Sequence, residues 1–159
     1  MTLVLWRIAA DTDKYKAEDL TGAGAAKSGG RWNKKDVPAL YCATSISLAC
    51  METVVHLNAL PFNRFLIRIE VPDLVAKAAV TRGVSTLPIG WDAEPSGYES
   101  IQLGTEWLQS ASTCLLFVPS IIVPEEQNVV INPSHPDSAK ITATKVRKWT
   151  YDPRFRGKK

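Results

Sequence analysis

The sequence is poor in the residues that build metal centres and disulfide frameworks. Its 159 residues include three cysteines and two histidines, and no two cysteines stand in a CxxC arrangement. An odd number of cysteines without such spacing argues against a disulfide scaffold and against a structural zinc site. The cysteines are Cys42, Cys50 and Cys114. We therefore expect no bound metal.

Long apolar runs and glycine-rich phosphate loops are also missing. No stretch approaches the roughly 18 apolar residues of a membrane span, and the beginning of the chain, which contains Arg7, does not read as a signal peptide. Neither G-x-G-x-x-G nor G-x-x-x-x-G-K occurs, which excludes the Rossmann and Walker fingerprints. No helix-turn-helix, zinc-finger or aromatic RNA-binding pattern is present. We expect a cytoplasmic protein without membrane or direct nucleic-acid contacts.

The composition is that of one globular domain with a basic end. Apolar residues make up 45% of the chain and charged residues 22%. Residues 145–159 carry seven basic side chains and one acidic one, a charge of +6, which leaves −3 on residues 1–144 of a chain whose net charge is +3. This tail is either a solvated, frayed terminus or a contact for an acidic partner or nucleic acid. The second interpretation describes a non-enzymatic interaction module.

Hydrophobic periodicity predicts an α+β domain over residues 1–159, with more strand than helix. The expected strands are 3–8, 40–43, 64–71, 114–118, 128–131 and 141–149. One helix is expected from a cap at Thr44 or Ser45 to about residue 60, and another over 99–110. Residues 81–97 contain prolines and glycines and are expected to form a long loop, a kind of segment that often has a function.

Glu52 is the most informative single residue. It is the only fully charged residue between Asp36 and Arg64. On the predicted helix it shares a face with Leu48, Val55, His56 and Ala59. A carboxylate on a mostly apolar face is costly unless it is paired. It is therefore either a catalytic group in a cleft or a structural glutamate, placed at the rim of the buried face or paired with an arginine.

A second feature is the run Gly29-Gly30-Arg31-Trp32-Asn33. Two glycines allow positive φ angles and a close approach of the backbone to a ligand. The guanidinium that follows can bind phosphate oxygens through two parallel hydrogen bonds. The competing interpretation is an ordinary turn with a surface arginine.

Motifs along nearly the whole chain, about residues 3–145, resemble the RES domain. The matching positions are Trp6-Arg7, 29–33, Pro38, Leu40-Tyr41, Ser47, Ala49, Glu52, Gly104, Trp107-Leu108, Val118-Pro119-Ser120 and 128–136. One position departs from the family, because Asp36 stands where the family usually has glycine. Aspartate tolerates the left-handed backbone conformation, so the turn can survive.

The resemblance implies a toxin of a bacterial toxin–antitoxin pair, with a fold similar to ADP-ribosyltransferase toxins. It also implies that NAD⁺ is the substrate and is cleaved between nicotinamide and ribose. The ADP-ribose would go to a protein side chain, to water as in an NAD⁺ glycohydrolase, or to phosphate. The implied partner is similar to Xre-type antitoxins with a helix-turn-helix portion, and it would form a hetero-oligomer with the toxin and block the active site.

The chemistry of this reaction assigns three tasks to the residues of the motifs. Nicotinamide departs as a neutral molecule and leaves an oxocarbenium-like ribose, as in glycoside cleavage. Glu52 would stabilise that positive charge and orient the nucleophile. Arg31, with Arg7, would hold the pyrophosphate. Tyr41 would stack on nicotinamide, unless it is simply a core aromatic residue.

Further residues are candidates for the rim of the same site. Ser120 would bind ribose or phosphate, or else is a turn serine. Asn132 is predicted to help bind NAD⁺, and His135 to shape the rim. Trp32 and Asn33 are expected to hold the arginine turn in place rather than to touch the substrate.

Overall fold

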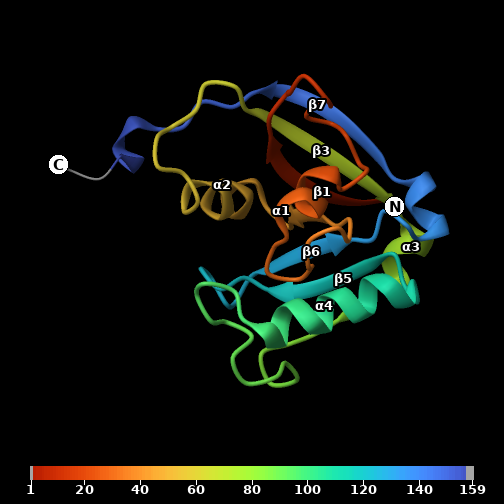
Figure 1. Ribbon diagram of the computed structural model, residues 1–159. Helices are drawn as coiled ribbons and strands as arrows, with labels where there is room; N and C mark the ends of the chain where they lie inside the picture. Colours follow the sequence, from red (N-terminus) through yellow and green to blue (C-terminus); the bar gives the residue numbers. More distant parts are fainter. Residues whose placement is uncertain (1, 157–159) are drawn as a thin grey trace.

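The computed structural model describes residues 2–156 and contains a seven-stranded sheet with the strand order β4-β5-β6-β2-β1-β3-β7. Its strands are β1 (Thr2–Ala9), β2 (Leu40–Ala43), β3 (Phe65–Pro72), β4 (Val80–Thr81), β5 (Leu115–Pro119), β6 (Gln127–Ile131) and β7 (Thr142–Lys148). The helices are α1 (Ala23–Ser28), α2 (Ile46–Val54), α3 (Asp73–Lys77) and α4 (Tyr98–Ser110), with 3₁₀ turns at Pro136–Lys140 and Pro153–Phe155. Figure 1 shows α4 along β5 and α2 at the side of the sheet. The predicted α+β class is confirmed.

The sheet is nearly divided in two between β1 and β2. Among the described residues these strands pair only at Trp6 and Ala43. By contrast, β1 pairs with β3 over its whole length, from Thr2 opposite Pro72 to Ala9 opposite Phe65. Backbone groups that lack a ladder partner are available to side chains or ligands. The junction between the two half-sheets is therefore where a site can open.

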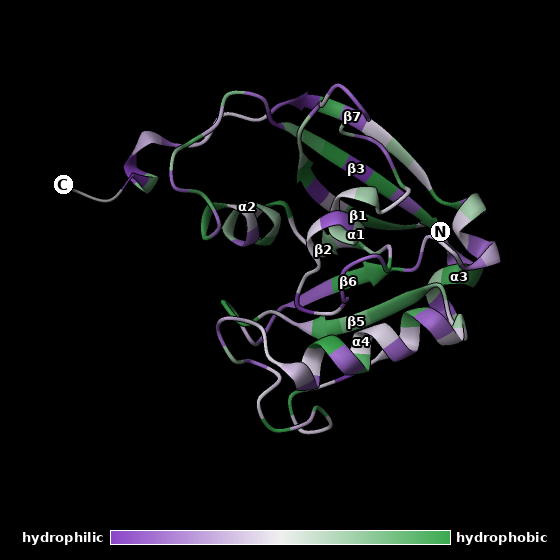
Figure 2. Ribbon diagram, in the orientation of Figure 1, coloured by the Kyte–Doolittle hydropathy of each residue, from purple (hydrophilic) through white to green (hydrophobic). Residues whose placement is uncertain are grey.

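The core follows the alternation of apolar residues along the strands. Leu5, Ile67, Ile69 and Val129 are fully buried in one cluster at the centre of the sheet. A second cluster lies under α4 and contains Trp107 and Leu108, and a third lies under α2. Figure 2 shows β5 as largely hydrophobic, whereas β6 passes from hydrophilic at its start to hydrophobic. The polar start of β6 lies at the site described below.

Helix α2 begins where the sequence predicts and ends earlier. The Ser45 hydroxyl accepts a hydrogen bond from the Leu48 amide at 3.1 Å, which is the expected N-cap. The helix ends at Val54 instead of near residue 60. The chain leaves the helix because Leu57 and Leu60 turn to pack on the third cluster. The prediction that Ala59 shares the helical face of Glu52 is therefore wrong.

The basic C-terminal segment is folded up to Arg156, so it is not frayed there, although its basic residues Arg147, Lys148, Arg154 and Arg156 are exposed to solvent as the first interpretation expects. Strand β7 pairs with β3, and Lys145 lies 2.9 Å from Asp11 and 3.5 Å from Glu18. The hydrogen bond from Lys145 lowers the pKa of Asp11. The Tyr151 hydroxyl is 2.8 Å from that of Thr53 on α2. Lys158 and Lys159, which belong to the same basic segment, lie outside the described residues.

Within residues 2–156 no helix has both the length and the apolar character needed to cross a bilayer.

Candidate active site

A cleft of about 740 Å³ opens at the junction between the two half-sheets. Its walls come from β1, β2, α1, α2, the arginine turn, the loop before α4 and the polar start of β6. Six residues that line it are Arg7, Arg31, Tyr41, Glu52, Glu94 and Asn128. The volume lies within the roughly 300–1,000 Å³ that small-molecule sites occupy. Four of the residues predicted from the sequence thus meet in one cleft.

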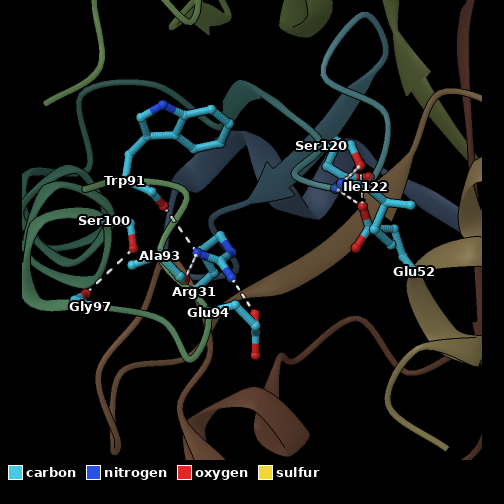
Figure 3. A network of polar contacts seen from close by, with 10 residues as sticks. Arg31, Glu52, Trp91, Ala93, Glu94, Gly97, Ser100, Ser120 and Ile122 are labelled. Carbon is cyan, nitrogen blue, oxygen red and sulfur yellow. Dashed lines mark hydrogen bonds and ion pairs between the residues drawn. The ribbon is translucent and has the colours of Figure 1, made fainter. Parts of the chain in front are cut away.

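Glu52 is held by two neutral donors. Its Oε1 accepts a hydrogen bond from the Ser120 hydroxyl at 2.6 Å and another from the Asn128 side-chain amide at 2.7 Å (Figure 3 shows the first). Within residues 2–156 the carboxylate forms no ion pair with lysine or arginine. The structural interpretation of an arginine-paired glutamate is therefore wrong. The carboxylate is oriented by these two donors and has no cationic partner within residues 2–156.

Ser120 supports Glu52 and is itself fixed. Its hydroxyl accepts hydrogen bonds from the amides of Ile122 and Val123 at 3.0 and 3.1 Å, and it is fully buried. With both its lone pairs and its proton engaged, Ser120 is a positioning residue for the carboxylate. Asn128, which belongs to a matching motif but was not predicted as a site residue, holds the carboxylate in the same way from β6.

Arg7 bridges the two half-sheets from β1. Its Nη1 donates to the Tyr41 carbonyl on β2 at 3.1 Å, where the strand ladder is missing. Its Nε is buried and has no partner among the described residues. Burial lowers the pKa of Arg7, yet a guanidinium remains charged in proteins. Because a guanidinium has five N–H donors, Arg7 brings a cation with unused donors into the cleft.

Arg31 lies at the other side of the cleft, on the turn after the double glycine. Gly29 has φ +71°, and Asp36 adopts the same left-handed angle where the family usually has glycine. The predicted survival of this turn is confirmed. The Arg31 guanidinium donates to the carbonyls of Trp91 and Ala93 and to the carboxylate of Glu94.

Tyr41 is locked by its hydroxyl. It donates to the Asn33 side-chain oxygen at 2.5 Å and accepts from the Trp32 amide at 3.0 Å. Burial raises the pKa of Tyr41, so the phenol stays protonated. Asn33 is fully buried and also donates to carbonyls on both sides of the turn, including Ala25 and Val37 at 2.9 Å. Asn33 thus holds the turn as predicted, and the fixed ring of Tyr41 lines the cleft.

Three residues predicted from the sequence, Ser120, Asn132 and His135, lie outside the lining of the cleft. Ser120 contacts Glu52 instead of the cleft itself. Asn132 is buried and donates to the Leu108 carbonyl at 2.9 Å, while its side-chain oxygen accepts from the Ser134 amide. His135 accepts from the Asp137 amide and begins a 3₁₀ turn. Both stabilise the segment after β6 and do not extend the site.

The cysteines do not add a nucleophile. Cys42 lines the cleft but is buried, and burial raises the pKa of its thiol to about 12. A thiol in that state is a poor nucleophile and a poor metal ligand. No group of three or more histidine, cysteine or acidic side chains converges within the described part of the chain.

This arrangement is a split, mixed sheet whose cleft pairs one oriented carboxylate with two arginines. Residues 4–154 match the RES domain family, and the chain belongs to that family. A protein from Sphingobium sp. named "Prs ADP-ribosylating toxin" is 58% identical over 157 residues, which cover 98% of each chain. A protein from Pseudomonas putida named "Toxin Res" is 38% identical over 96% of this chain and 99% of its own.

A solved structure supports the fold. A chain of the M. tuberculosis MbcT–MbcA toxin–antitoxin complex superposes with a TM-score of 0.67 over 92% of this chain and 85% of that one. The sequence identity is 17%, so this likeness concerns the fold alone.

Proposed function

We propose that this protein is the toxin of a toxin–antitoxin pair and that it cleaves NAD⁺ between nicotinamide and ribose to transfer ADP-ribose to a protein. Family membership and the name of the Sphingobium relative support the reaction class. The observation that carries the proposal is the single oriented carboxylate of Glu52, which shares a cleft with Arg7 and Arg31.

The environment of Glu52 suits a sugar that becomes positive. As nicotinamide leaves, the C1′–N bond breaks with both electrons going to the ring nitrogen, and the ribose takes up positive charge. A carboxylate held by Ser120 and Asn128 needs little reorganisation to face that charge. Its second oxygen is then available to the ribose hydroxyls or to the incoming nucleophile.

Two buried polar atoms without partners also fit a dinucleotide. Among residues 2–156 these include Nε of Arg7, a donor, and Oδ1 of Asn128, an acceptor, and both side chains line the cleft. A buried polar group without a partner costs about 1–3 kcal/mol. A phosphate oxygen at Arg7 and a ribose hydroxyl at Asn128 would remove both costs. In this arrangement the pyrophosphate lies between Arg7 and Arg31, and the nicotinamide lies against Tyr41.

Arg31→Ala is expected to weaken NAD⁺ binding by about 1.5–3 kcal/mol, because a charge-assisted contact with phosphate is lost. Calorimetry on protein that also carries Glu52→Gln, to prevent turnover, measures this affinity. The melting temperature must be followed as well, since Arg31 also binds the carbonyls of Trp91 and Ala93. Unchanged affinity in a folded variant would remove Arg31 from the phosphate site.

Arg7→Lys is expected to reduce NAD⁺ affinity about tenfold, which corresponds to one lost hydrogen bond to a charged group. Lysine keeps the positive charge, but it lacks the guanidinium fork. Arg68→Lys is the matched control and should bind normally, because Arg68 lies in the middle of β3, pairs with Glu70 and does not line the cleft. If Arg7→Lys lowers the melting temperature without changing affinity, Arg7 only bridges the half-sheets.

The fate of ADP-ribose separates a transferase from an NAD⁺ glycohydrolase. The protein is incubated with NAD⁺ labelled in its adenylate phosphate, with and without cell lysate, and free nicotinamide is measured in parallel. A transferase leaves label on a protein band, and the protein that the Sphingobium relative's name calls Prs is the first candidate acceptor. Release of nicotinamide with label only in free ADP-ribose indicates hydrolysis. Absence of nicotinamide in both reactions contradicts the proposal.

The partner we propose is an Xre-like antitoxin that acts in the cytoplasm by placing a segment in the cleft and excluding NAD⁺. A consumer of NAD⁺ harms its own host unless it is inhibited, so such a partner is expected on chemical grounds. Occupation of the cleft would make NAD⁺ and antitoxin compete for Arg7, Arg31 and Glu52.

A further inference from the structure

The Arg31 guanidinium is already occupied in this structure. Its Nη1 donates to the Trp91 carbonyl at 3.0 Å and to the Ala93 carbonyl at 2.8 Å, and its Nη2 donates to the Glu94 carboxylate at 2.7 Å. Figure 3 shows these three contacts converging on Arg31 from the loop that precedes α4. The contacts with Trp91 and Ala93 cannot be predicted from the composition of this loop, because backbone carbonyls make them.

The three contacts fall into two kinds. The carbonyls are neutral, bind Nη1 and fix the direction of the side chain. The Glu94 carboxylate is charged and accepts a hydrogen bond from Nη2. The side chains of Arg31 and Glu94 both line the cleft. The Arg31 side chain is 13% exposed, whereas that of Glu94 is 64% exposed. The carboxylate of Glu94 is therefore accessible to solvent, whereas the guanidinium of Arg31 that it contacts is largely buried.

A carboxylate and a phosphate compete for the same edge of a guanidinium, because both accept its parallel N–H donors. We propose that Glu94 is an anionic latch, which occupies the phosphate position on Arg31 and must be displaced when the pyrophosphate of NAD⁺ binds. This inference rests on the proposed function. The carbonyls of Trp91 and Ala93 hold Nη1 during the exchange, so Arg31 stays in place while its partner changes.

The exposure of Glu94 makes the exchange possible. Ion pairs with a solvent-exposed partner are weak, so the latch lowers the affinity for NAD⁺ without closing the cleft. The apparent affinity of a ligand falls by the fraction of molecules in the competent state. Glu94 thus sets the NAD⁺ concentration at which the site fills, and it should have little effect on bond cleavage once NAD⁺ is bound.

The test is Glu94→Gln, which keeps the shape of the side chain and removes its charge. Binding of ADP-ribose is measured by calorimetry, because this probe retains the pyrophosphate and cannot be cleaved at the nicotinamide bond. Glu99→Gln is the matched control: Glu99 is exposed and packs beside Gly90 and Gly97 of the same loop, but it does not contact Arg31. We expect about two- to fivefold tighter binding for Glu94→Gln and no change for Glu99→Gln.

Kinetics provide a second readout. For Glu94→Gln the KM for NAD⁺ should fall with kcat nearly unchanged, because only the free enzyme is affected. Combined with Arg31→Ala, Glu94→Gln should lose its effect, since the latch acts through that guanidinium. Equal or weaker ADP-ribose binding by Glu94→Gln overturns the latch while the proposed function stands. If the wild-type protein binds neither ADP-ribose nor NAD⁺, the proposed function fails and the latch falls with it.

Discussion

Replacing Glu52 by glutamine should lower the rate of nicotinamide release by about 10²–10⁴-fold and leave the protein folded. Glutamine keeps a carbonyl oxygen that can accept the hydrogen bonds of Ser120 and Asn128, so the local structure is retained. What it removes is the negative charge that faces the ribose as nicotinamide leaves. The measurement is nicotinamide release at saturating NAD⁺, together with a melting curve and toxicity on expression in cells.

The control for this substitution is Glu106→Gln. Glu106 lies exposed on α4 and bonds to Gln102, so its replacement removes the same charge far from the chemistry. Its activity should equal that of the wild-type protein. A folded Glu52→Gln variant with normal turnover would show that this carboxylate has no part in the reaction.

The second large effect is expected from Gly104→Ala, which should lower the free energy of unfolding by about 3 kcal/mol or more. Helix α4 crosses the arginine turn at Gly104, where a Cβ would lie 2.6 Å from the Trp32 carbonyl carbon and 2.7 Å from its Cα. Backbone atoms cannot move aside as a flexible side chain can. The helix must separate from the turn, which also loses the hydrogen bond between the Lys34 amide and Thr105. A melting temperature lower by roughly 6–12 °C is expected.

Gly24→Ala is the matched control, because Gly24 is also helical but has room. A Cβ there would meet only the Tyr15 hydroxyl, at 3.7 Å. Alanine is a better helix former than glycine, so this variant should be equal in stability or more stable by up to about 1 kcal/mol. Two glycine-to-alanine variants with the same melting temperature would show that the close approach at Gly104 does not constrain the fold.

The elements with strong periodicity could be predicted from the sequence. Alternation over 64–71 predicted β3 to within one residue at each end, and the Ser45 cap set the start of α2. Helices α1 and α3 were missed because they span six and five residues, too few to show a helical period. The end of α2 was misplaced because it depends on where Leu57 and Leu60 find the core, which is a tertiary effect.

The site could be predicted as far as its residues carry unusual local chemistry. Glu52 stood out as an isolated charge, and Arg31 as a cation after two glycines. Asn128 could not be found in this way, because it meets Glu52 across 76 positions of sequence. The engagement of Arg31 by the loop before α4 was equally hidden, since its two carbonyl contacts can come from any residue type. Within that loop Glu94 contacts Arg31 through its side chain, and this contact can be recognised only after the fold is known.

The most direct test of the account is a crystal structure of the Glu52→Gln variant with intact NAD⁺. The nicotinamide ribose should lie beside residue 52, with the pyrophosphate on Arg7 and Arg31 and the nicotinamide against the Tyr41 ring. NAD⁺ bound elsewhere, or bound in the cleft with its nicotinamide ribose turned away from residue 52, would contradict the assignment of Glu52 as the group that stabilises the sugar.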